Sequence, residues 1–456
     1  MYRSRLRGHG SVAGVNIELY GRLAMVWASL LGAFAVPATA TAQQFTEVRA
    51  SRFNFGDIEF DWARDGINCP SCNFGQGNAR FNWTDNTGNV WLGHVDSQSG
   101  AFTPENGKAE LVDTTAANYK IYGNGPEWAF SQQGSQLVYT RYVPGMPFTA
   151  ANAGAAYATM IDGIWTPAFF NGGLGSIVPI ATQALADPLA LASFATIATP
   201  TQISFEYVSA SGAPGPVSVK CDNDAIRWVP GTHQLLCVGY PMPRPKGPIH
   251  TQILWLDTDT NNTKALTTDS TNKLDGFMFR APEFGDNYVF FTVENGLKID
   301  VYEQSGTDGT GAPDFELINQ IASPDPSQPY ISSPEPFVHC SPDCQTYIFM
   351  SICAQNDRPG TRSTSVPNGL AVTNIDPAQP VLKQLTDDVN SPQRVRYDPE
   401  YFITANGPYL YYERYLLKTS TTAAKSEGEF YIDMQLGPPS GVCVGSSAEG
   451  GLLAGC

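Results

Sequence analysis

Four glutamates in this 456-residue chain share one setting, in which each follows a proline at the start of an apolar, strand-like stretch. They are Glu127, Glu283, Glu335 and Glu400. Carboxylates that are brought together can bind a hard cation such as calcium, or they can act as the acid and base that cleave a glycosidic bond. Either chemistry depends on a fold that places such residues side by side.

A repeated spacing pattern indicates that fold. In segments 253–269 and 370–388 an apolar strand ends in Asp257 or Asp376, and each aspartate is followed by the same Leu-Thr-x-Asp sequence. Short runs of β-branched and aromatic residues between turn residues are typical of strands. The unit is therefore four short strands, and four-stranded units that recur at intervals of tens of residues predict a β-propeller.

Six such units can be placed along the chain. The four Pro-Glu stretches begin four of them, "AIRWVPGTHQLLCVGY" begins another at Arg227, and "GDIEFDW" begins the first at Glu59. The last unit has only three obvious strands, so a strand within residues 45–55 is expected to complete it and to remove exposed sheet edges. We predict an all-β, six-bladed β-propeller closed by an N-terminal strand, with a five-bladed propeller as the alternative if Glu59 does not begin its own blade.

The repeat resembles that of the TolB-like β-propellers, a family with WD-like repeats. The resemblance is carried by the Pro-x-aromatic starts, the Ser-Pro-Asp turn in "HCSPDCQTYIF" and the Leu-Thr-x-Asp sequences, and it covers residues 46–436 as a degenerate repeat. Most first turns lack the family's Ser-Pro-Asp-Gly, and the separate N-terminal α/β domain of TolB has no counterpart. The resemblance therefore implies the fold and not TolB's partners.

The chain divides into a leader, a propeller domain and a tail. Residues 1–42 predict a bacterial-type signal peptide, because arginines precede an apolar run that ends in small residues. Residues 43–436 form the predicted propeller, with an Ala/Gly-rich insertion at about 143–200, and residues 437–456 form a Gly/Ser-rich tail. Within the insertion, residues 182–197 could form a helical lid over the channel, or the insertion could pack beside its own blade.

Charge and cysteine content limit the partners and the compartment. A net charge of -16 argues against nucleic acid and anionic membrane as partners. The chain has nine cysteines, and in an exported chain close pairs among them predict disulfides. The expected arrangement is Cys69 with Cys72, Cys221 with Cys237, Cys340 with Cys344, Cys443 with Cys456, and Cys353 as a buried thiol. A zinc site formed by Cys69, Cys72, Cys340 and Cys344 is the alternative for those four residues.

The residues that begin the blades should gather around one end of the channel, because the first strand of each blade lies nearest the propeller axis. These residues are Glu59, Glu127, Arg227, Glu283, Glu335 and Glu400. Like charges so close need a bound cation, the Arg227 counter-charge or a raised pKa, and oxygen ligands alone suit calcium better than zinc. Alternatively, each glutamate accepts backbone N–H bonds from the neighbouring blade and clasps the two blades together.

These features favour an exported, monomeric, non-catalytic binding or scaffold protein, whose protein or carbohydrate partner binds at the acidic channel mouth. The alternative is a secreted glycosidase that uses two of the channel glutamates. The chain has no Gly-x-Ser-x-Gly elbow, which argues against a propeller peptidase. Catalysis would require two suitably spaced carboxylates, one with a raised pKa, whereas a scaffold would have its glutamates bonded to the backbone.

Overall fold

The structure, a computed structural model, describes much of one compact unit that runs from Phe45 to Cys456. The predicted signal peptide, the pair Cys69 and Cys72, and the pair Cys443 and Cys456 lie outside the described residues. The described residues are 45–55, 58–60, 79–114, 126–131, 134–147, 152–169, 176–177, 183–184, 194–199, 202–208, 214–219, 221–229, 232, 234–239, 250–257, 260, 262–356, 366–386, 393–417 and 420–440.

Strands form nearly all of the regular structure in this part of the chain, and they fall into seven sheets. The first sheet contains β2 (Glu59–Phe60), β3 (Arg80–Thr84), β4 (Val90–Val95), β5 (Phe102–Thr103) and β6 (Glu110–Asp113). The second contains β7 (Glu127–Ser131), β8 (Gly134–Tyr142), β9 (Ala153–Ile161), β10 (Ile164–Phe169) and β12 (Gln183–Ala184). The third contains β11 (Ser176–Ile177), β13 (Phe194–Thr199), β14 (Gln202–Val208) and β15 (Pro214–Val219).

The remaining four sheets each contain four strands in antiparallel order. One contains β16 (Cys221–Trp228), β17 (Gln234–Gly239), β18 (Gln252–Asp257) and β19 (Thr263–Ala265). The next contains β20 (Lys273–Ala281), the 3₁₀ turn η3 (Pro282–Phe284), β21 (Asn287–Glu294), β22 (Lys298–Thr307) and β23 (Pro313–Ala322). The last two contain β24 (Tyr330–Cys340), β25 (Cys344–Cys353), β26 (Asn368–Asn374) and β27 (Leu382–Gln384), and then β28 (Arg394–Thr404), β29 (Gly407–Leu416), β30 (Lys425–Asp433) and β1 (Val48–Ser51).

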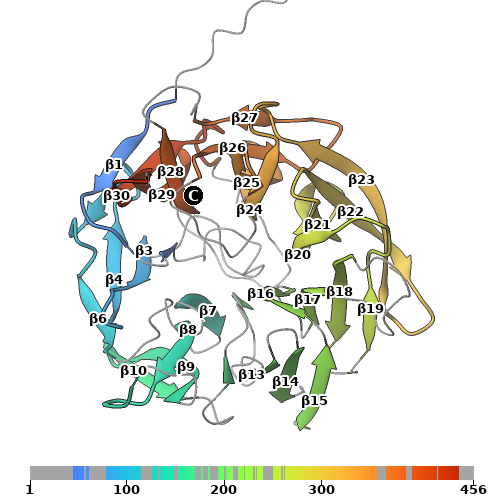
Figure 1. The fold of residues 1–456 in the computed structure, drawn as a ribbon, viewed down its shortest axis with the longest axis horizontal. Helices are drawn as coiled ribbons and strands as arrows, with labels where there is room; N and C mark the ends of the chain where they lie inside the picture. The colour runs from blue at the N-terminus through green and yellow to red at the C-terminus, as the bar shows by residue number, and fades with distance from the viewer. Residues whose placement is uncertain are drawn as a thin grey trace, which may run out of the picture. The chain divides into compact units, whose positions relative to one another are not determined.

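The sheets are arranged as a β-propeller, in which successive sheets stand around a common centre (Figure 1). Contacts between sheets follow the order of the chain: β2 with β7, β9 with β11, β14 with β16, β16 with β20, β20 with β24, and β24 with β28. In addition, β28 contacts β2, so the last sheet of the chain is also a neighbour of the first. The strands β16, β20, β24 and β28 lie nearest the centre (Figure 1).

Seven sheets are one more than the six units expected from the sequence, and two more than the alternative of five. The additional sheet, β11–β13–β14–β15, begins within the segment expected to be an insertion at about 143–200. The same segment also supplies β9 and β10, which are outer strands of the second sheet. Residues 183–184 and 194–197 belong to strands, where the sequence had suggested a helix. Alanine and glycine give little strand signal, and for this reason the extra unit was not predicted.

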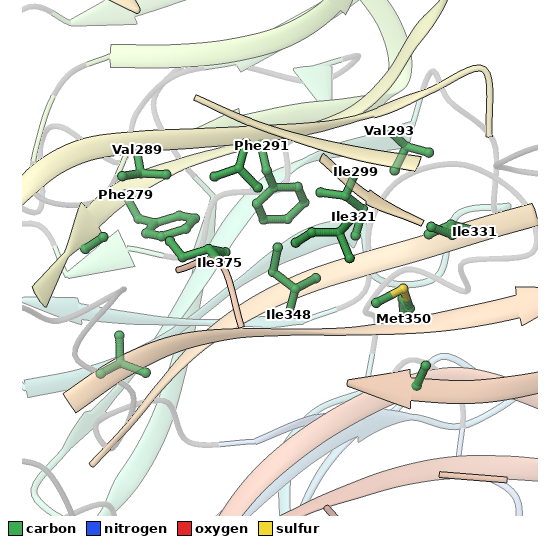
Figure 2. Packing of buried hydrophobic residues seen from close by; sticks show 14 of the residues in the cluster. Phe279, Val289, Phe291, Val293, Ile299, Ile321, Ile331, Ile348, Met350 and Ile375 are labelled. Carbon is green, nitrogen blue, oxygen red and sulfur yellow. The ribbon is translucent and has the colours of Figure 1, made fainter. Parts of the chain in front are cut away.

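Adjacent sheets are held together by apolar layers. Between the β20–β23 and β24–β27 sheets, Phe279, Phe291 and Ile299 pack against Ile348 and Met350, and all five side chains are fully or almost fully buried (Figure 2). Strands that are covered on both faces have no polar face, and every residue of β26 is accordingly buried. Full burial of one such side chain contributes about 1.5 to 3 kcal/mol.

A short N-terminal strand completes the last sheet, where the sequence had placed a strand within residues 45–55. Strand β1 pairs antiparallel with β30 over only a few residues. The side chain of Glu47, just before β1, accepts hydrogen bonds from Arg396 Nε at 2.8 Å, from Arg396 Nη2 at 3.0 Å and from the Tyr412 hydroxyl at 2.7 Å. These bonds tie the start of the described chain to β28 and β29.

The described cysteines agree with the expected arrangement wherever it can be compared. Cys340 and Cys344 form a disulfide across the β24–β25 turn, so they are not zinc ligands. Cys237 is disulfide-bonded, and the side chain of Cys221, its expected partner, is not described. Cys353 is a buried thiol whose Sγ lies 2.9 Å from the carbonyl oxygen of Gln355.

Replacing Glu47 by alanine should destabilise the fold. The Glu47 carboxylate accepts two hydrogen bonds from the buried Arg396, so we expect the loss of about 1.5 to 3 kcal/mol in the free energy of unfolding at pH 7, measured by urea denaturation. Burial alone would raise the pKa of Glu47, but the bonds and charge of Arg396 hold that pKa below its ordinary value of 4.5. The contribution of Glu47 is therefore complete above pH 4.5 and is lost as the pH falls below it.

The matched control is Glu316→Ala, which removes an exposed glutamate from β23. It should change the unfolding free energy by less than about 0.5 kcal/mol. Equal effects of the two substitutions would show that the bonds of Glu47 do not stabilise the N-terminal strand.

Candidate functional site

Glu335 and Glu400 occupy the same place in their sheets. Each lies in the strand nearest the centre, directly after a β-bulge, in β24 and β28 respectively. Pro334 and Pro399 fall within these bulges. The extra residue of a bulge leaves the hydrogen-bond ladder, so the missing N–H of proline costs no bond there. This placement explains why a proline precedes each of the two glutamates inside a strand.

Glu283 does not share that place. It lies in η3, after β20 has ended, and the residue of β20 that corresponds to Glu335 in register is Phe277. The Glu283 carboxylate accepts hydrogen bonds from the Thr346 backbone N–H at 2.9 Å and from the Thr346 hydroxyl at 3.0 Å. Because Thr346 belongs to β25, Glu283 clasps two neighbouring sheets, as the alternative interpretation of the sequence proposed.

Glu59 and Glu127 begin β2 and β7. The carbonyl oxygen of Glu59 accepts a hydrogen bond from Trp128 Nε1 at 3.1 Å, and this bond joins the first two sheets. The side chain of Glu127 is not described. Glu400 is buried, with 5% of its surface exposed, on the face of the last sheet that turns toward the first.

The pKa of Glu335 is shifted far from its ordinary value, and the charges that act on it define a group of neighbours. Burial raises the pKa of Glu335 to about 7, the charge of Arg227 lowers it, and the charges of Asp398 and Asp275 raise it. These four residues come from the inner strands of four consecutive sheets: β16, β20, β24 and β28. We refer to Arg227, Asp275, Glu335 and Asp398 as the inner acidic cluster.

The bulges bring the two aspartates to the cluster. Asp275 and Asp398 have φ angles of 44° and 53°, and Ser333 takes the corresponding place in β24 with a φ angle of 46°. This left-handed conformation is uncommon outside glycine, and aspartate and asparagine adopt it more readily than most residues. A bulge also bends its strand and redirects the side chain. Bulges at corresponding places in β20, β24 and β28 therefore position Asp275, Glu335 and Asp398.

Arg227 supplies the positive charge of the cluster. Its guanidinium carbon lies 4.9 Å from the centre of the Phe277 ring, in a cation–π contact between β16 and β20. Phe277 takes the register position that glutamate takes in the next two sheets. The charge of Arg227 lowers the pKa of Glu335.

Sequence reasoning missed Asp275 and Asp398, although a signal for both is present. Each precedes a glycine or a proline, in "LDGF" and "YDPE", within a stretch that otherwise has a strand pattern. Asp-Gly and Asp-Pro dipeptides mark turns, and inside a strand such a mark indicates a bulge. The two positions do not form an identical repeat, because Ser333 takes the corresponding place in β24, so they do not stand out in the sequence as the repeated glutamates do.

Calcium was considered from the sequence as a ligand of the blade-start glutamates. Among the described residues, no group of three or more His, Cys, Asp or Glu side chains is arranged to hold a metal ion.

The comparisons with known proteins do not identify a family. No family model and no curated protein matches the chain. Among solved structures it is similar to a protein of unknown function from Dyadobacter fermentans, with 12% identity, 86% of this chain and 98% of that chain covered, and a TM-score of 0.37. It is also similar to the periplasmic gluconolactonase of Pseudomonas aeruginosa, with 10% identity, coverage of 78% and 94%, and a TM-score of 0.39.

A third similar structure is Sqt1 of Saccharomyces cerevisiae, with 9% identity, coverage of 86% and 98%, and a TM-score of 0.39. At these identities and TM-scores, the likenesses say nothing about what the present chain does. Its function has to be argued from its own residues.

The clasp formed by Glu283 can be tested by substitution. Glu283→Ala removes both acceptors and leaves the Thr346 N–H without its partner, so the free energy of unfolding should fall by about 1 to 3 kcal/mol. Glu283→Gln keeps one oxygen acceptor and should lose less. Urea denaturation of both variants measures the difference, and equal stability of Glu283→Ala and wild type would contradict the clasp.

Proposed function

We propose that the chain is an exported, monomeric, seven-bladed propeller of TolB-like type that acts as a non-catalytic binding protein. Seven sheets, the pairing of β1 with β30 and the contact of β28 with β2 support a ring closed by the N-terminal strand. The Cys340–Cys344 disulfide is compatible with an oxidising compartment. In the described part of the chain, no helix has the length and apolar character needed to cross a membrane.

The inner acidic cluster is the binding site in this proposal, and a positively charged segment of a protein is its partner. The cluster holds three carboxyl groups, and Arg227 is the cation that acts on Glu335. Burial, and after it the charges of Asp398 and Asp275, raises the pKa of Glu335 to about 7, so this carboxyl group holds a proton up to about neutral pH. A lysine or arginine side chain brought to the cluster would replace that proton and restore the ionised form of Glu335. The proton that Glu335 holds near neutral pH, beside Asp275 and Asp398, is the observation on which the proposal rests.

Binding of a lysine-rich peptide should therefore depend on pH. Because Glu335 must lose its proton, the affinity should rise by up to tenfold per pH unit below pH 7 and level off above it. It should also weaken with added salt, since screening reduces attraction between charges. Isothermal titration calorimetry between pH 5.5 and 8.5 measures both effects.

Two variants complete this experiment. Glu335→Gln should bind the peptide more weakly at pH 8 and show a flat pH profile, whereas Glu316→Gln removes the same charge from an exposed site and should behave like the wild type. An unchanged affinity and pH profile in Glu335→Gln would count against the site.

A second function is favoured by one specific observation. A carboxyl group with a pKa of about 7 beside other carboxylates is the arrangement that a glycosidase uses for its general acid. In a secreted carbohydrate-active hydrolase of this kind, Glu335 would protonate the leaving oxygen. Asp275 or Asp398 would act as the base or the nucleophile.

Hydrolysis of an oligosaccharide panel distinguishes the two functions. A hydrolase should release reducing ends with a rate that falls as the pH rises through about 7, because Glu335 must be protonated to act as the acid. Glu335→Gln should lower kcat by at least a hundredfold. Absence of hydrolysis, combined with pH-dependent peptide binding, would leave the binding protein as the function.

A further inference from the structure

The last sheet contains a row of cross-strand neighbours where the N-terminal strand joins the C-terminal one. Glu429 of β30 lies directly opposite Glu413 of β29 on one side and opposite Ser51 of β1 on the other. Glu413 in turn lies opposite Tyr397 of β28. Residues that are directly opposite in a sheet share a face, so two glutamates stand side by side at the seam between β1 and β30.

Both glutamates are buried. Glu429 is 0% exposed and Glu413 is 6% exposed. Neither carboxyl oxygen of Glu429 has a hydrogen-bond partner, whereas Glu413 accepts a hydrogen bond from the Tyr415 hydroxyl. An ionised carboxylate without a partner, in the protein interior and beside a second carboxylate, is strongly disfavoured. Glu429 is therefore neutral when β1 is docked, and burial, followed by the charges of Glu413 and Asp398, raises its pKa well above the ordinary value of 4.5.

The described groups around Glu429 include no cation that reaches it. Its charged neighbours in β29 and β28 are carboxylates, and beyond Ser51 the exposed Arg52 pairs with Glu105. The described titratable or charged groups on and next to this face include Tyr397, Asp398, Glu400, Tyr409, Tyr411, Glu413, Tyr415, Tyr431, Asp96, Arg52 and Glu105.

We propose that the seam between β1 and β30 is a proton-dependent latch, in which Glu429 must hold a proton while β1 is docked and its ionisation releases β1. The strand is suited to release, because it has four residues and only three register pairs with β30. Undocking β1 exposes the edge of β30 and lets water reach Glu429. The ionised carboxylate is stable there, so loss of the proton and loss of the strand accompany each other.

The sign of the pH dependence follows from linkage. A carboxyl group that holds its proton more tightly in the docked state favours docking at low pH, and this contribution is lost as the pH rises above 4.5. Glu47, on the opposite face of the same sheet, acts in the reverse sense, because its bonds with Arg396 require the ionised form. Docking of β1 is thus strongest near pH 4.5, because the contribution of Glu47 is lost below that pH and the contribution of Glu429 is lost above it.

Hydrogen exchange of the β1 amides tests the latch in the intact chain. After division by the intrinsic exchange rate, the opening equilibrium of Val48 to Ser51, measured between pH 5 and pH 9, should rise with pH above 4.5 by up to tenfold per pH unit. Amides of β26, which lies in another sheet and is buried throughout, provide the internal reference and should show no such rise.

Substitutions assign the effect to the carboxyl pair. Glu429→Gln resembles the protonated acid in shape and charge, so the β1 amides of this variant should stay protected up to pH 9. Glu413→Gln removes the repelling neighbour and should move the rise to higher pH. Glu316→Gln, which is exposed on β23, should follow the wild type.

Three results would overturn the latch. The first is a flat opening equilibrium for β1 in the wild type. The second is an equal rise in wild type and Glu429→Gln. The third is protection of β1 by added calcium or magnesium that the Glu429→Gln variant loses, because a cation and not a proton would then neutralise the pair.

Discussion

Apolar layers between neighbouring sheets are the constraint on which the described fold depends, because several clusters of buried side chains each draw on two sheets. A sheet that contributes to such a layer cannot bury its apolar face alone. One of these layers joins the last sheet to the first. There the aromatic side chains of β28 and β29, including Phe402 and Tyr411, pack against Phe60 and Phe102 from the start of the chain. A four-residue strand, β1, supplies the outer edge of this sheet.

Burial between sheets also sets the rules for charged side chains, and the structure meets those rules in three ways. Lys273 is fully buried and pairs with Asp300 at 2.8 Å and Glu294 at 2.7 Å, so opposite charges cancel. Both carboxyl oxygens of Glu283 accept hydrogen bonds from Thr346 of the next sheet, and these bonds offset part of the effect of burial, which raises the pKa of Glu283. Glu429 has neither a cation nor a donor, and a proton is the remaining means of neutralising it. Neutralisation of Glu429 by a proton makes the docking of β1 depend on pH.

The sequence predicted the features that depend on local pattern. The four-strand unit, the strand before residue 55 and the buried thiol of Cys353 all follow from spacing and residue type, and the structure contains them. The disulfide between Cys340 and Cys344 follows from their separation of four residues in one turn. The seventh sheet was missed, because the segment that begins it is rich in alanine and glycine and lacks the repeat's marker residues.

The site was harder to predict, since it depends on register. A Pro-Glu pair can lie at a bulge, as it does at Glu335, which belongs to the inner acidic cluster. It can also lie after the end of a strand, as it does at Glu283, which joins two neighbouring sheets. The sequence alone does not show which applies. Glu283 lies six residues after Phe277, the residue of β20 in register with Glu335, yet the strand-like residue pattern around Glu283 is the same as that around Glu335. The aspartates in the bulges were overlooked for the same reason, since their role arises from a backbone conformation and not from a repeated residue type.

Asp398 connects the two acidic regions of the protein. Its charge raises the pKa of Glu335 in the inner acidic cluster and also that of Glu429 at the seam. A cationic group bound at the cluster would offset the field of Asp398, so it would reduce the cost of ionising Glu429 while β1 is docked. The strand would then stay docked to higher pH when the cluster is occupied. Because coupling between two sites is reciprocal, docking of β1 would favour the bound cation to the same extent. Asp398 therefore couples binding of a cationic group at the inner acidic cluster to docking of β1 in the last sheet.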